Sequence, residues 1–548
     1  MAQLTGGEAI VKSLIHHGMD TLFCLPGVQN DHFFNALYDE GGDTRIIHTR
    51  HEQGAAYMAL GYALSQENKP GIYSVVPGAG FLNTATALST AYGANAKVFC
   101  MTGQIPSTFI GRGFGQLHEI PDQLGVMRSL TKWAERIRSP AEAPRLIREA
   151  FRQMYSGRPR PVALECAMDT LAERTEVTLL RDETAVSDLT DNPPVNLDRA
   201  EEAAKRLGNA KNPLIFVGGG AMHASEEVKQ LAEMLEAPVV TYSMGRGVLS
   251  SDHYLSQFIH AGYPLWQKAD AILAVGTRLS PALLRWGVEP GDKLIKIDVD
   301  PEDHTRHPKT AVRLVADAKD ALQAIIELAG KHNGKRESRE AELRDLKAQS
   351  NKLTDRLGPQ KAYLNAIRAE LPPEGLFVDE VTQMGFASRL IMPVYNPYTY
   401  ISPGYQGTLG WGFATALGVK VAHPDKPVVS VSGDGGFMFT VQELATAVQQ
   451  KIGLVTLVFN DGAFGNVRRM QKQNYNNRLI ASDLQNPDFV KLAESFGAQG
   501  LRANSPEELR EALKRGFATS DVPTVVDVPF GEVPSPWPFI MAPKTLWN

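Results

Sequence analysis

The segment formed by residues 428–461 constrains the fold of this chain more than any other stretch. It opens with the apolar, β-branched run Val428–Ser432, which is typical of a buried parallel strand. A glycine-rich turn follows, and the pair Thr440 and Glu443 then has the spacing of a capping box that would open a helix. A second apolar strand is expected over Leu454–Phe459. The segment therefore predicts a βαβ unit, whose two strands run parallel and end at the same edge of a sheet.

Acidic and amide side chains come directly after both of these strands. Asp434 follows the first strand, within the turn Gly433–Gly436, and Asn460 and Asp461 follow the second. Because α/β proteins bind ligands at the carboxyl ends of their strands, both carboxylates are expected in a binding site. Their oxygens suit a hard divalent cation, and the glycines let the main chain approach phosphate oxygens. The pattern predicts a diphosphate site that contains a metal ion.

Composition narrows the class of protein. The 548 residues are enough for three or four domains of ordinary size. The net charge of -5, without a lysine-rich tail, argues against nucleic acid as a partner. No apolar run approaches the ~18 residues that cross a bilayer, and the first residues resemble an amphipathic helix capped by Thr5 and Glu8 rather than a signal peptide. Three cysteines without metal spacing fit reduced core thiols, so a cytoplasmic protein that binds no membrane is expected.

Strand and helix signals alternate along almost the whole chain, which predicts an α/β protein with parallel sheets. Three blocks can be separated, at residues 1–170, 195–330 and 357–548. A polar stretch that ends at Pro194 links the first two, and a charged helical linker over residues 331–356 links the last two. The predicted diphosphate site lies in the third block.

The middle block has an incomplete nucleotide-binding pattern. A strand over residues 214–217 leads into Gly218–Gly220, which lacks the spacing of a full G-x-G-x-x-G fingerprint. Asp298 lies too far along the chain to be assigned as a ribose ligand. Two interpretations stay open: a vestigial structural domain, or a domain that binds FAD, a CoA moiety or another nucleotide-containing cofactor.

The pattern around the two carboxylates resembles the thiamin diphosphate signature, in which a GDG triplet precedes a pair of asparagines. Asp434 and Asn460 are 26 positions apart, and Asp461 stands where that family more often has a second asparagine. Aspartate also ligates Mg²⁺, so the departure adds negative charge without removing the metal site. The resemblance implies that Mg²⁺ is bound by Asp434, Asp461 and Ala463. It implies cofactor contacts in this block from Gly433, Asp434, Gly435, Gly436, Asp461, Ala463, Phe464 and Gly465.

The first block contains a motif for the other half of such a site. Residues 49–56 read T-R-H-E-Q-G-A-A and resemble the R-H-E-Q-G-A-A motif of acetolactate synthases and their relatives. In that family the glutamate is the carboxyl group that protonates the aminopyrimidine ring of the cofactor. The resemblance therefore assigns this catalytic and cofactor-binding role to Glu52.

Four further motifs resemble the same family, at residues 23–27, 77–83, 102–106 and 407–412. In the last of these, Leu409 would wedge under the cofactor and bend it, and the Gly407 carbonyl would accept a hydrogen bond from its amino group. The resemblance implies further cofactor contacts from Pro26, Asn83, Thr382 and Gln383. It covers all three blocks and is closest to thiamin diphosphate enzymes of the acetolactate synthase and benzaldehyde lyase type. It implies three doubly wound domains: pyrimidine-binding, central Rossmann-like and diphosphate-binding.

The substrate-facing residues are less clearly indicated. Residues 110–119 resemble a stretch of acetolactate synthases, whereas residues 130–134 are closer to benzaldehyde lyase. A glutamine of the family reaches the reacting carbonyl from this region, which makes Gln116 a candidate. His118 is an alternative acid–base group, since histidine titrates near neutrality. Gln29 stands where some carboligases have a histidine. For Gln116 and His118, a solvated loop is the competing interpretation.

Several features depart from a biosynthetic acetolactate synthase. The synthases usually have a tryptophan near residues 466–471, where this chain has none, and Leu409 replaces their methionine. The tail over residues 534–539 is rich in proline and aromatics. It is expected either to close over the active site as a lid or to pack as a terminal strap.

The resemblance implies cleavage or formation of a C–C bond in a 2-keto acid, aldehyde or 2-hydroxy ketone, by a non-oxidative decarboxylase, lyase or carboligase. One alternative is a FAD-containing acetolactate synthase or oxidase. Another is a cofactor-binding regulatory protein without turnover. The resemblance also implies that the cofactor lies between the first domain of one subunit and the third domain of another. A homodimer is then the minimum unit, and a homotetramer is expected.

Overall fold

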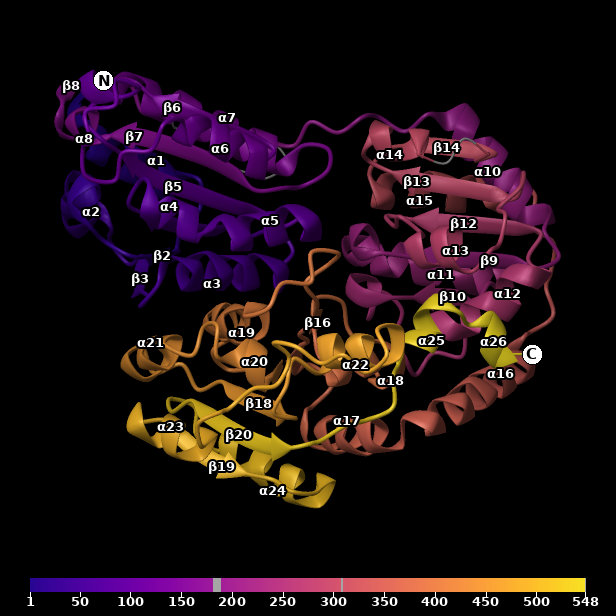
Figure 1. Cartoon of the computed structure of the whole chain (residues 1–548). Coiled ribbons are helices and arrows are strands. Elements are labelled where there is room, and N and C mark those ends of the chain that lie inside the picture. Colours follow the sequence, from indigo (N-terminus) through magenta and orange to yellow (C-terminus); the bar gives the residue numbers. More distant parts are fainter. Residues whose placement is uncertain (181–188, 307–308, 548) are drawn as a thin grey trace.

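The computed structural model describes residues 1–180, 189–306 and 309–547. This part of the chain contains three six-stranded sheets, and every strand pairing within them is parallel. Figure 1 shows three domains, with the N-terminal domain above the C-terminal one and the central domain beside both. The predicted α/β class with three parallel-sheet domains is confirmed. The exact domain bounds remain a prediction, and residues 181–188 of the expected first linker lie outside the described residues.

The first sheet has the strand order β3-β2-β4-β5-β7-β6. Its strands are β2 (Thr21–Cys24), β3 (Arg45–His48), β4 (Gly71–Val75), β5 (Val98–Gln104), β6 (Trp133–Ile137) and β7 (Val162–Ala167). Its helices include α1 (Gly6–His16), α2 (Asp31–Glu40), α3 (Glu52–Leu64), α4 (Ala79–Asn83), α5 (Ala85–Ala94), α6 (Gln123–Leu130) and α7 (Ala143–Tyr155). The capping box predicted for α1 is confirmed, because the Glu8 amide donates to Thr5 Oγ1 and the Thr5 amide donates to Glu8 Oε2. The short strands β1 (Ala2–Thr5) and β8 (Arg174–Val177) pair antiparallel beside this sheet.

The central sheet has the order β11-β10-β9-β12-β13-β14. Its strands are β9 (Pro213–Val217), β10 (Val239–Thr241), β11 (Ser256–Phe258), β12 (Ala271–Val275), β13 (Leu294–Asp298) and β14 (Val312–Val315). The helices α10 (Leu197–Asn209), α11 (Ser225–Leu235) and α15 (Ala318–Ala329) bury apolar faces in this domain. The chain order around β9 and β12 reverses direction, which makes their carboxyl ends the switch point of this sheet.

The third sheet has the order β16-β15-β17-β18-β20-β19. Its strands are β15 (Leu376–Val378), β16 (Tyr400–Ile401), β17 (Val428–Gly433), β18 (Val455–Asn460), β19 (Gln499–Arg502) and β20 (Thr524–Pro529). The predicted βαβ unit is confirmed, since β17 and β18 are adjacent and parallel. Helices α18 (Gln383–Ile391), α20 (Asp434–Phe437) and α22 (Gly465–Asn474) follow the carboxyl ends of β15, β17 and β18 and so surround the expected site.

The capping box predicted for the helix of this unit is wrong. Helix α21 (Glu443–Gln449) begins at Glu443, and its N-cap Gln442 makes no side-chain cap. Thr440 Oγ1 donates instead to the Gly410 carbonyl, and the Glu443 carboxylate accepts from the backbone amides of Arg50 and His51 in the first domain. Both side chains satisfy groups of other segments, and these partners are not visible in the local spacing.

The helix that carries Glu52 packs closely on the third domain. Helices α3 and α19 (Trp411–Ala422) approach so closely that a Cβ at Gly61 would lie 2.0 Å from the Thr415 carbonyl oxygen. A Cβ at Gly418 would likewise lie 1.8 Å from the Met58 carbonyl oxygen. Glycine is required at both positions because backbone atoms of the neighbouring helix occupy the space.

The C-terminal tail crosses from the third domain to the central one (Figure 1). Its helices α25 (Trp537–Met541) and α26 (Lys544–Trp547) lie against the central domain, where Trp286 Nε1 donates to the Ile540 carbonyl and Trp547 Nε1 donates to the His260 carbonyl. The tail therefore packs against the central domain as a terminal strap, one of the two arrangements expected from its sequence. The charged linker is helical, as expected, over α16 (Glu340–Leu353).

Two smaller predictions also have an outcome. The cysteines Cys24, Cys100 and Cys166 are free and buried, as expected for core thiols. Burial raises the pKa of the Cys24 and Cys100 thiols to about 12. Within the described ranges, no helix combines the length and the apolar character needed to cross a membrane.

Candidate functional site

Two carboxylates meet at the carboxyl edge of the third sheet. Asp434 is the first residue of α20, directly after β17, and Asp461 directly follows β18. Asn486, from a loop further along the chain, donates through Nδ2 to Asp434 Oδ2 at 2.6 Å and to Asn460 Oδ1 at 3.2 Å. The Asp461 side chain is held by the Ala463 amide, which donates to Oδ1 at 3.2 Å. The parallel pairing of β17 and β18 thus brings together residues that are far apart in sequence.

The protein offsets the charge of this pair only in part, through hydrogen-bond donors and, for Asp461, the charge of Arg468. Burial raises the pKa of Asp434, and burial together with the nearby charge of Asp434 raises the pKa of Asp461 to about 6. Carboxylates that repel each other in a desolvated place are stabilised by a cation between them. Two carboxylates and the Ala463 carbonyl are hard oxygen donors, which fit Mg²⁺. The described residues contain no group of three or more acidic, histidine or cysteine side chains with metal-ligand geometry.

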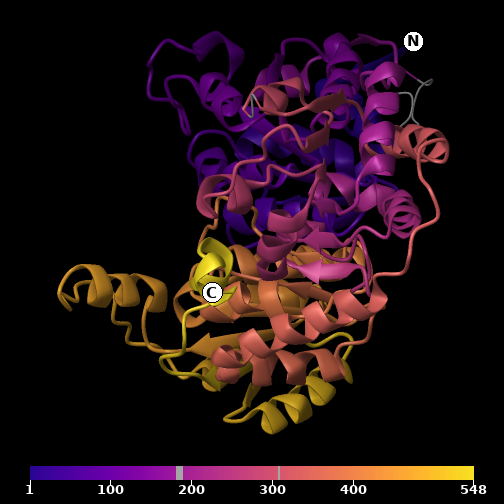
Figure 2. The ribbon, with the colours of Figure 1, turned by 90° about the vertical axis from the view of Figure 1, so that its right-hand side faces the viewer.

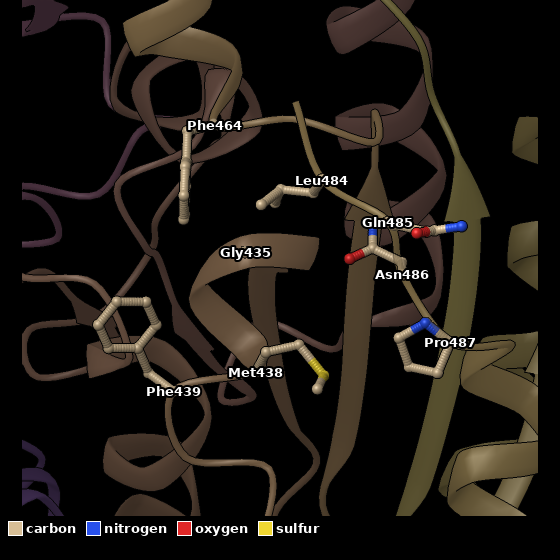
Figure 3. Close-up of a pocket in the computed structure, with 8 residues that line it drawn as sticks. All are labelled: Gly435, Met438, Phe439, Phe464, Leu484, Gln485, Asn486 and Pro487. Atoms are coloured by element: carbon tan, nitrogen blue, oxygen red, sulfur yellow. The ribbon is translucent and has the colours of Figure 1, made fainter. Parts of the chain in front are cut away.

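A pocket of about 330 Å³ opens beside the carboxylates. It is lined by Gly435, Met438, Phe439, Phe464, Leu484, Gln485, Asn486 and Pro487. Figure 3 shows Phe464 and Leu484 on one side of Gly435 and Met438 and Phe439 on the other, with Asn486 at the end near the strands. The pocket wall is largely apolar, with the amides of Gln485 and Asn486 at one end.

The other predicted residues of the third domain surround the same edge. Thr382 is the N-cap of α18, where its Oγ1 accepts from the Gly385 amide, and Gln383 is the first residue of that helix. A Cβ at Gly433 would lie 3.1 Å from Thr382 Cγ2, so the ends of β15 and β17 are in contact. Phe464 and Gly465 begin α22. Gly407 and Leu409 lie in the loop before α19, which Thr408 ties to the Tyr57 hydroxyl of the first domain at 2.8 Å.

The predicted residues of the first domain form a second group. Glu52 is the first residue of α3, and its Oε2 accepts from Asn83 Nδ2 at 2.9 Å. Asn83 ends α4, so the motifs at residues 49–56 and 77–83 meet at this hydrogen bond. Pro26 lies in the loop after β2. No hydrogen bond or ion pair recorded for the described residues joins Glu52 or Asn83 to the carboxylates of the third domain.

The three substrate-facing candidates also lie in this domain, and two of them are in contact. His118 Nδ1 lies 3.0 Å from Gln29 Oε1, and Gln29 Nε2 donates to the Leu117 carbonyl at 3.0 Å. Gln29 is buried, and His118 has a left-handed backbone with φ of 67°. Gln116 is held through its backbone amide, which donates to Glu119 Oε2. The loop is thus an ordered turn, which makes Gln29 the anchor of His118.

Comparisons with known families decide between these chemical interpretations. Residues 4–126 match the N-terminal TPP binding domain of thiamine pyrophosphate enzymes, residues 200–325 match their central domain, and residues 380–528 match their C-terminal TPP binding domain. The chain belongs to the thiamine pyrophosphate enzyme family. Thiamine pyrophosphate is another name for thiamin diphosphate, so the predicted family is confirmed.

Full-length relatives agree with this assignment. One relative is "Probable 2-ketoarginine decarboxylase AruI" of Pseudomonas aeruginosa, which is 32% identical in sequence. The alignment covers 95% of this chain and 93% of the relative. A second relative is "Probable acetolactate synthase large subunit" of Methanocaldococcus jannaschii, which is 33% identical, with 96% of this chain and 92% of the relative aligned. A third relative is "Acetolactate synthase large subunit" of Haemophilus influenzae, which is 32% identical, with 96% of this chain and 95% of the relative aligned. The chain is therefore an acetolactate synthase-like enzyme of the thiamin diphosphate-dependent family.

The roles of three polar residues of this thiamin diphosphate enzyme were missed by the sequence analysis. Asn486 is half-buried and orders the carboxylate pair, and Glu443, expected as a capping residue, holds the segment before Glu52. Glu380 is fully buried two residues after β15, accepts from the Gly410 amide at 3.0 Å, and has its pKa raised by burial to about 7. The apolar run Leu376–Val378, followed by two acidic residues, was an available signal for Glu380. Asn486 has no local signal, because it reaches Asp434 from a loop 52 positions away.

The features of the central domain that suggested a nucleotide have protein partners. A Cβ at Gly218 would lie 2.3 Å from the Gly276 carbonyl oxygen, and a Cβ at Gly220 would lie 2.9 Å from Gly276 Cα. Asp298 pairs with Arg158 of the first domain at 3.0 Å. The contact between the loops after β9 and β12 accounts for the glycines, and the contact between domains accounts for the carboxylate.

We predict that the repulsion within the carboxylate pair destabilises the metal-free enzyme. The folded-state pKa of Asp461, about 6, lies above its usual 3.8, so the folded protein binds more protons between these values. Stability should therefore fall as pH rises through this window. Asp461→Asn should raise the urea midpoint of EDTA-treated protein at pH 7.5, and the gain should shrink at pH 4.5. Equal midpoints of the two proteins at pH 7.5 would contradict the expected repulsion.

Proposed function

We propose that this chain is a thiamin diphosphate- and Mg²⁺-dependent lyase or transferase that cleaves or forms a C–C bond without net oxidation. The substrate class is a 2-keto acid, aldehyde or 2-hydroxy ketone. The observation that carries the proposal is the carboxylate pair Asp434 and Asp461, which the fold places together beside the apolar pocket. The names of the relatives, a decarboxylase and acetolactate synthases, support the same range of reactions.

Each part of the site has a role in this proposal. Asp434, Asp461 and the Ala463 carbonyl would hold the Mg²⁺, and the amides at the start of α20 would face the diphosphate. When bound, the cofactor supplies a nucleophilic carbon that adds to the substrate carbonyl. Glu52 would hold the proton shared with the pyrimidine ring, and Asn83 would orient the Glu52 carboxylate. His118, positioned by Gln29, is a group that can exchange a proton with the substrate.

We also propose that the site is shared between two subunits. Large apolar side chains are exposed on the elements that carry both halves: Leu82, Phe114 and Leu117 in the first domain, and Met438 and Phe439 in the third. Exposed apolar patches of this kind mark interfaces. A homodimer in which each first domain faces the partner's third domain would cover both patches and would complete two sites. A homotetramer would be built from two such dimers.

The acetolactate synthase names of several relatives support one alternative, an enzyme that also binds FAD. The central domain gives this alternative less support, since its glycines and Asp298 are engaged by protein groups. The colour of the purified protein separates the two: a yellow protein favours the flavin enzyme, and a colourless one favours the non-oxidative enzyme.

Turnover by purified protein tests the function directly. The protein is supplied with thiamin diphosphate and Mg²⁺ and is assayed with pyruvate, longer and aromatic 2-keto acids, benzoin and acyloins. Cofactor-dependent CO₂, aldehyde or hydroxy ketone from a colourless protein is the expected result. No product from any donor, although the cofactor binds, would favour the regulatory alternative and reject the proposal.

We predict opposite effects for substitutions in the two halves of the site. Glu52→Gln should nearly abolish turnover and leave the cofactor Kd within about twofold, because Glu52 would act on the ring and not on the phosphates. Asp434→Ala should raise the Kd of Mg²⁺ and cofactor about tenfold or more, because it removes a charged metal ligand. Titration of cofactor by calorimetry, beside turnover at saturating cofactor, measures both. Lost cofactor binding with retained turnover in Glu52→Gln would reject its assignment.

We predict that a mixed dimer of these two inactive variants is active. If the sites are shared, one of them combines the intact Glu52 of the Asp434→Ala chain with the intact Asp434 of the Glu52→Gln chain, and the other site has both substitutions. The mixed dimer should therefore have about half of the wild-type activity. Co-expression with two different tags and two affinity steps isolates the mixed dimer. The two parent dimers are the controls. An inactive mixed dimer that binds cofactor would show that each site lies within one chain.

A further inference from the structure

Helix α22 carries three cationic side chains, and only two of them pair with a carboxylate. Arg468 pairs with Asp483 at 3.2 Å, and Lys472 pairs with Glu532 at 2.9 Å. Arg469 lies between them in sequence and has no carboxylate partner among the described residues, although it is partly buried. Its charge is thus left for a group outside the chain.

The contacts of Arg469 hold the guanidinium in place without neutralising it. Its Nη1 donates to Gln383 Oε1 at 3.0 Å, and its Nη2 donates to Asn466 Oδ1. The same Asn466 oxygen accepts from Trp537 Nε1 at 3.3 Å, so the amide is fixed from two sides. A guanidinium has five N–H donors, and both acceptors here are neutral amides. Burial lowers the pKa of Arg469, which agrees with a cation that lacks a partner.

The guanidinium lies at the rim of the cofactor site. Gln383 follows Thr382, which touches the end of β17 at Gly433. Asn466 follows Gly465, where a Cβ would lie 2.2 Å from Asp461 Oδ2. Arg469 therefore bridges the segments after β15 and β18, on either side of β17. Figure 2 shows α22 standing out from the body of the third domain.

The surroundings of Arg469 suit an organic acid. Val467 and Met470 are exposed on the same helix. The Trp537 ring contacts that of Phe386 at a tilt of 49°, with centroids 4.6 Å apart, and its indole N–H donates to Asn466. Apolar contacts for a carbon chain thus lie next to a fixed cation that can bind an oxyanion.

We propose that Arg469 binds a second anionic group of the substrate, remote from the carbonyl that reacts. The preferred donor would then be a 2-keto acid with another acid group at its far end. This inference rests on the proposed function. The carboxylate that leaves as CO₂ is a poor partner for Arg469, because an ion pair with it would stabilise the reactant more than the transition state. The cofactor diphosphate is a poor partner too, because the Mg²⁺ and the amides of α20 would bind it in the proposed site. A substrate with a cationic end, such as a guanidinium, would be repelled by Arg469.

Matched substrates test the proposal on the holoenzyme. 2-Ketoadipate and 2-ketohexanoate have the same carbon skeleton and differ in the terminal carboxylate, and 2-ketoarginine supplies the cationic case. Wild-type kcat/KM should be about tenfold or more higher for 2-ketoadipate than for 2-ketohexanoate. Arg469→Met should remove this preference, mainly through KM, and should leave 2-ketohexanoate within about twofold. Arg469→Lys should retain part of the preference for 2-ketoadipate. Lys472→Met removes a cation one turn further along the helix, and this matched control should retain the full preference.

A binding measurement separates this inference from the proposed reaction. Adipate has no keto group, so its titration into holoenzyme reports the anion site whether or not turnover occurs. Arg469→Met should weaken adipate binding about tenfold or more. Three results would overturn the proposal. The first is equal adipate binding by wild type and Arg469→Met, and the second is a wild-type preference for 2-ketohexanoate or 2-ketoarginine. The third is an equal loss of activity with all substrates in Arg469→Met, together with weaker cofactor binding. Adipate binding that depends on Arg469, without turnover of any donor, would instead reject only the proposed function.

Discussion

The site depends on two carboxylates that parallel strands force together. Because β17 and β18 are neighbours and point the same way, the residues that follow them share one edge of the sheet. Asp434 and Asp461 therefore repel each other in a partly desolvated place, where the Asn486 side-chain amide donates to Asp434 and the Ala463 backbone amide donates to Asp461. Such an arrangement is poorly satisfied by the protein alone and well satisfied by a divalent cation with a diphosphate. The glycines of the turn, the apolar pocket and the start of α22 are all arranged around this point.

Local sequence patterns predicted the parts of this arrangement that depend on local chemistry. The β-branched run before Asp434, the glycine turn and the second strand each have a short-range cause, and all three are present. The capping box failed because Glu443 is used for a contact with Arg50 and His51, almost four hundred positions away in the chain. Asn486 was missed for the same reason. Spacing predicts hydrogen bonds within one turn of chain, whereas these polar groups are satisfied by segments that only the tertiary fold brings near.

The central domain contributes to the site through the contacts that fix the other two domains. Arg158 of the first domain pairs with Asp298, at the end of β13, and with Asp300, just after it. The fully buried Arg246 of the central domain donates to the Ser388 carbonyl at 2.6 Å, within the helix that begins at Gln383. Buried guanidinium groups of this kind tolerate little displacement, because each would leave an unpaired charge. Through these contacts the central domain sets the position of the helix that begins at Gln383, one of the proposed cofactor contacts.

Glu443 gives each chain a rigid link between the two halves of the proposed site. Its carboxylate, in the helix shortly after the turn that carries Asp434, holds the backbone amides of Arg50 and His51 directly before Glu52. A buried carboxylate with three donors, including Thr446 Oγ1 at 2.6 Å, cannot shift without leaving N–H groups unpaired. If Glu52 serves the cofactor held by a partner chain, this link joins the metal site of one active centre to the catalytic carboxyl of the other. The Glu443 carboxylate is then one physical contact between the two proposed sites.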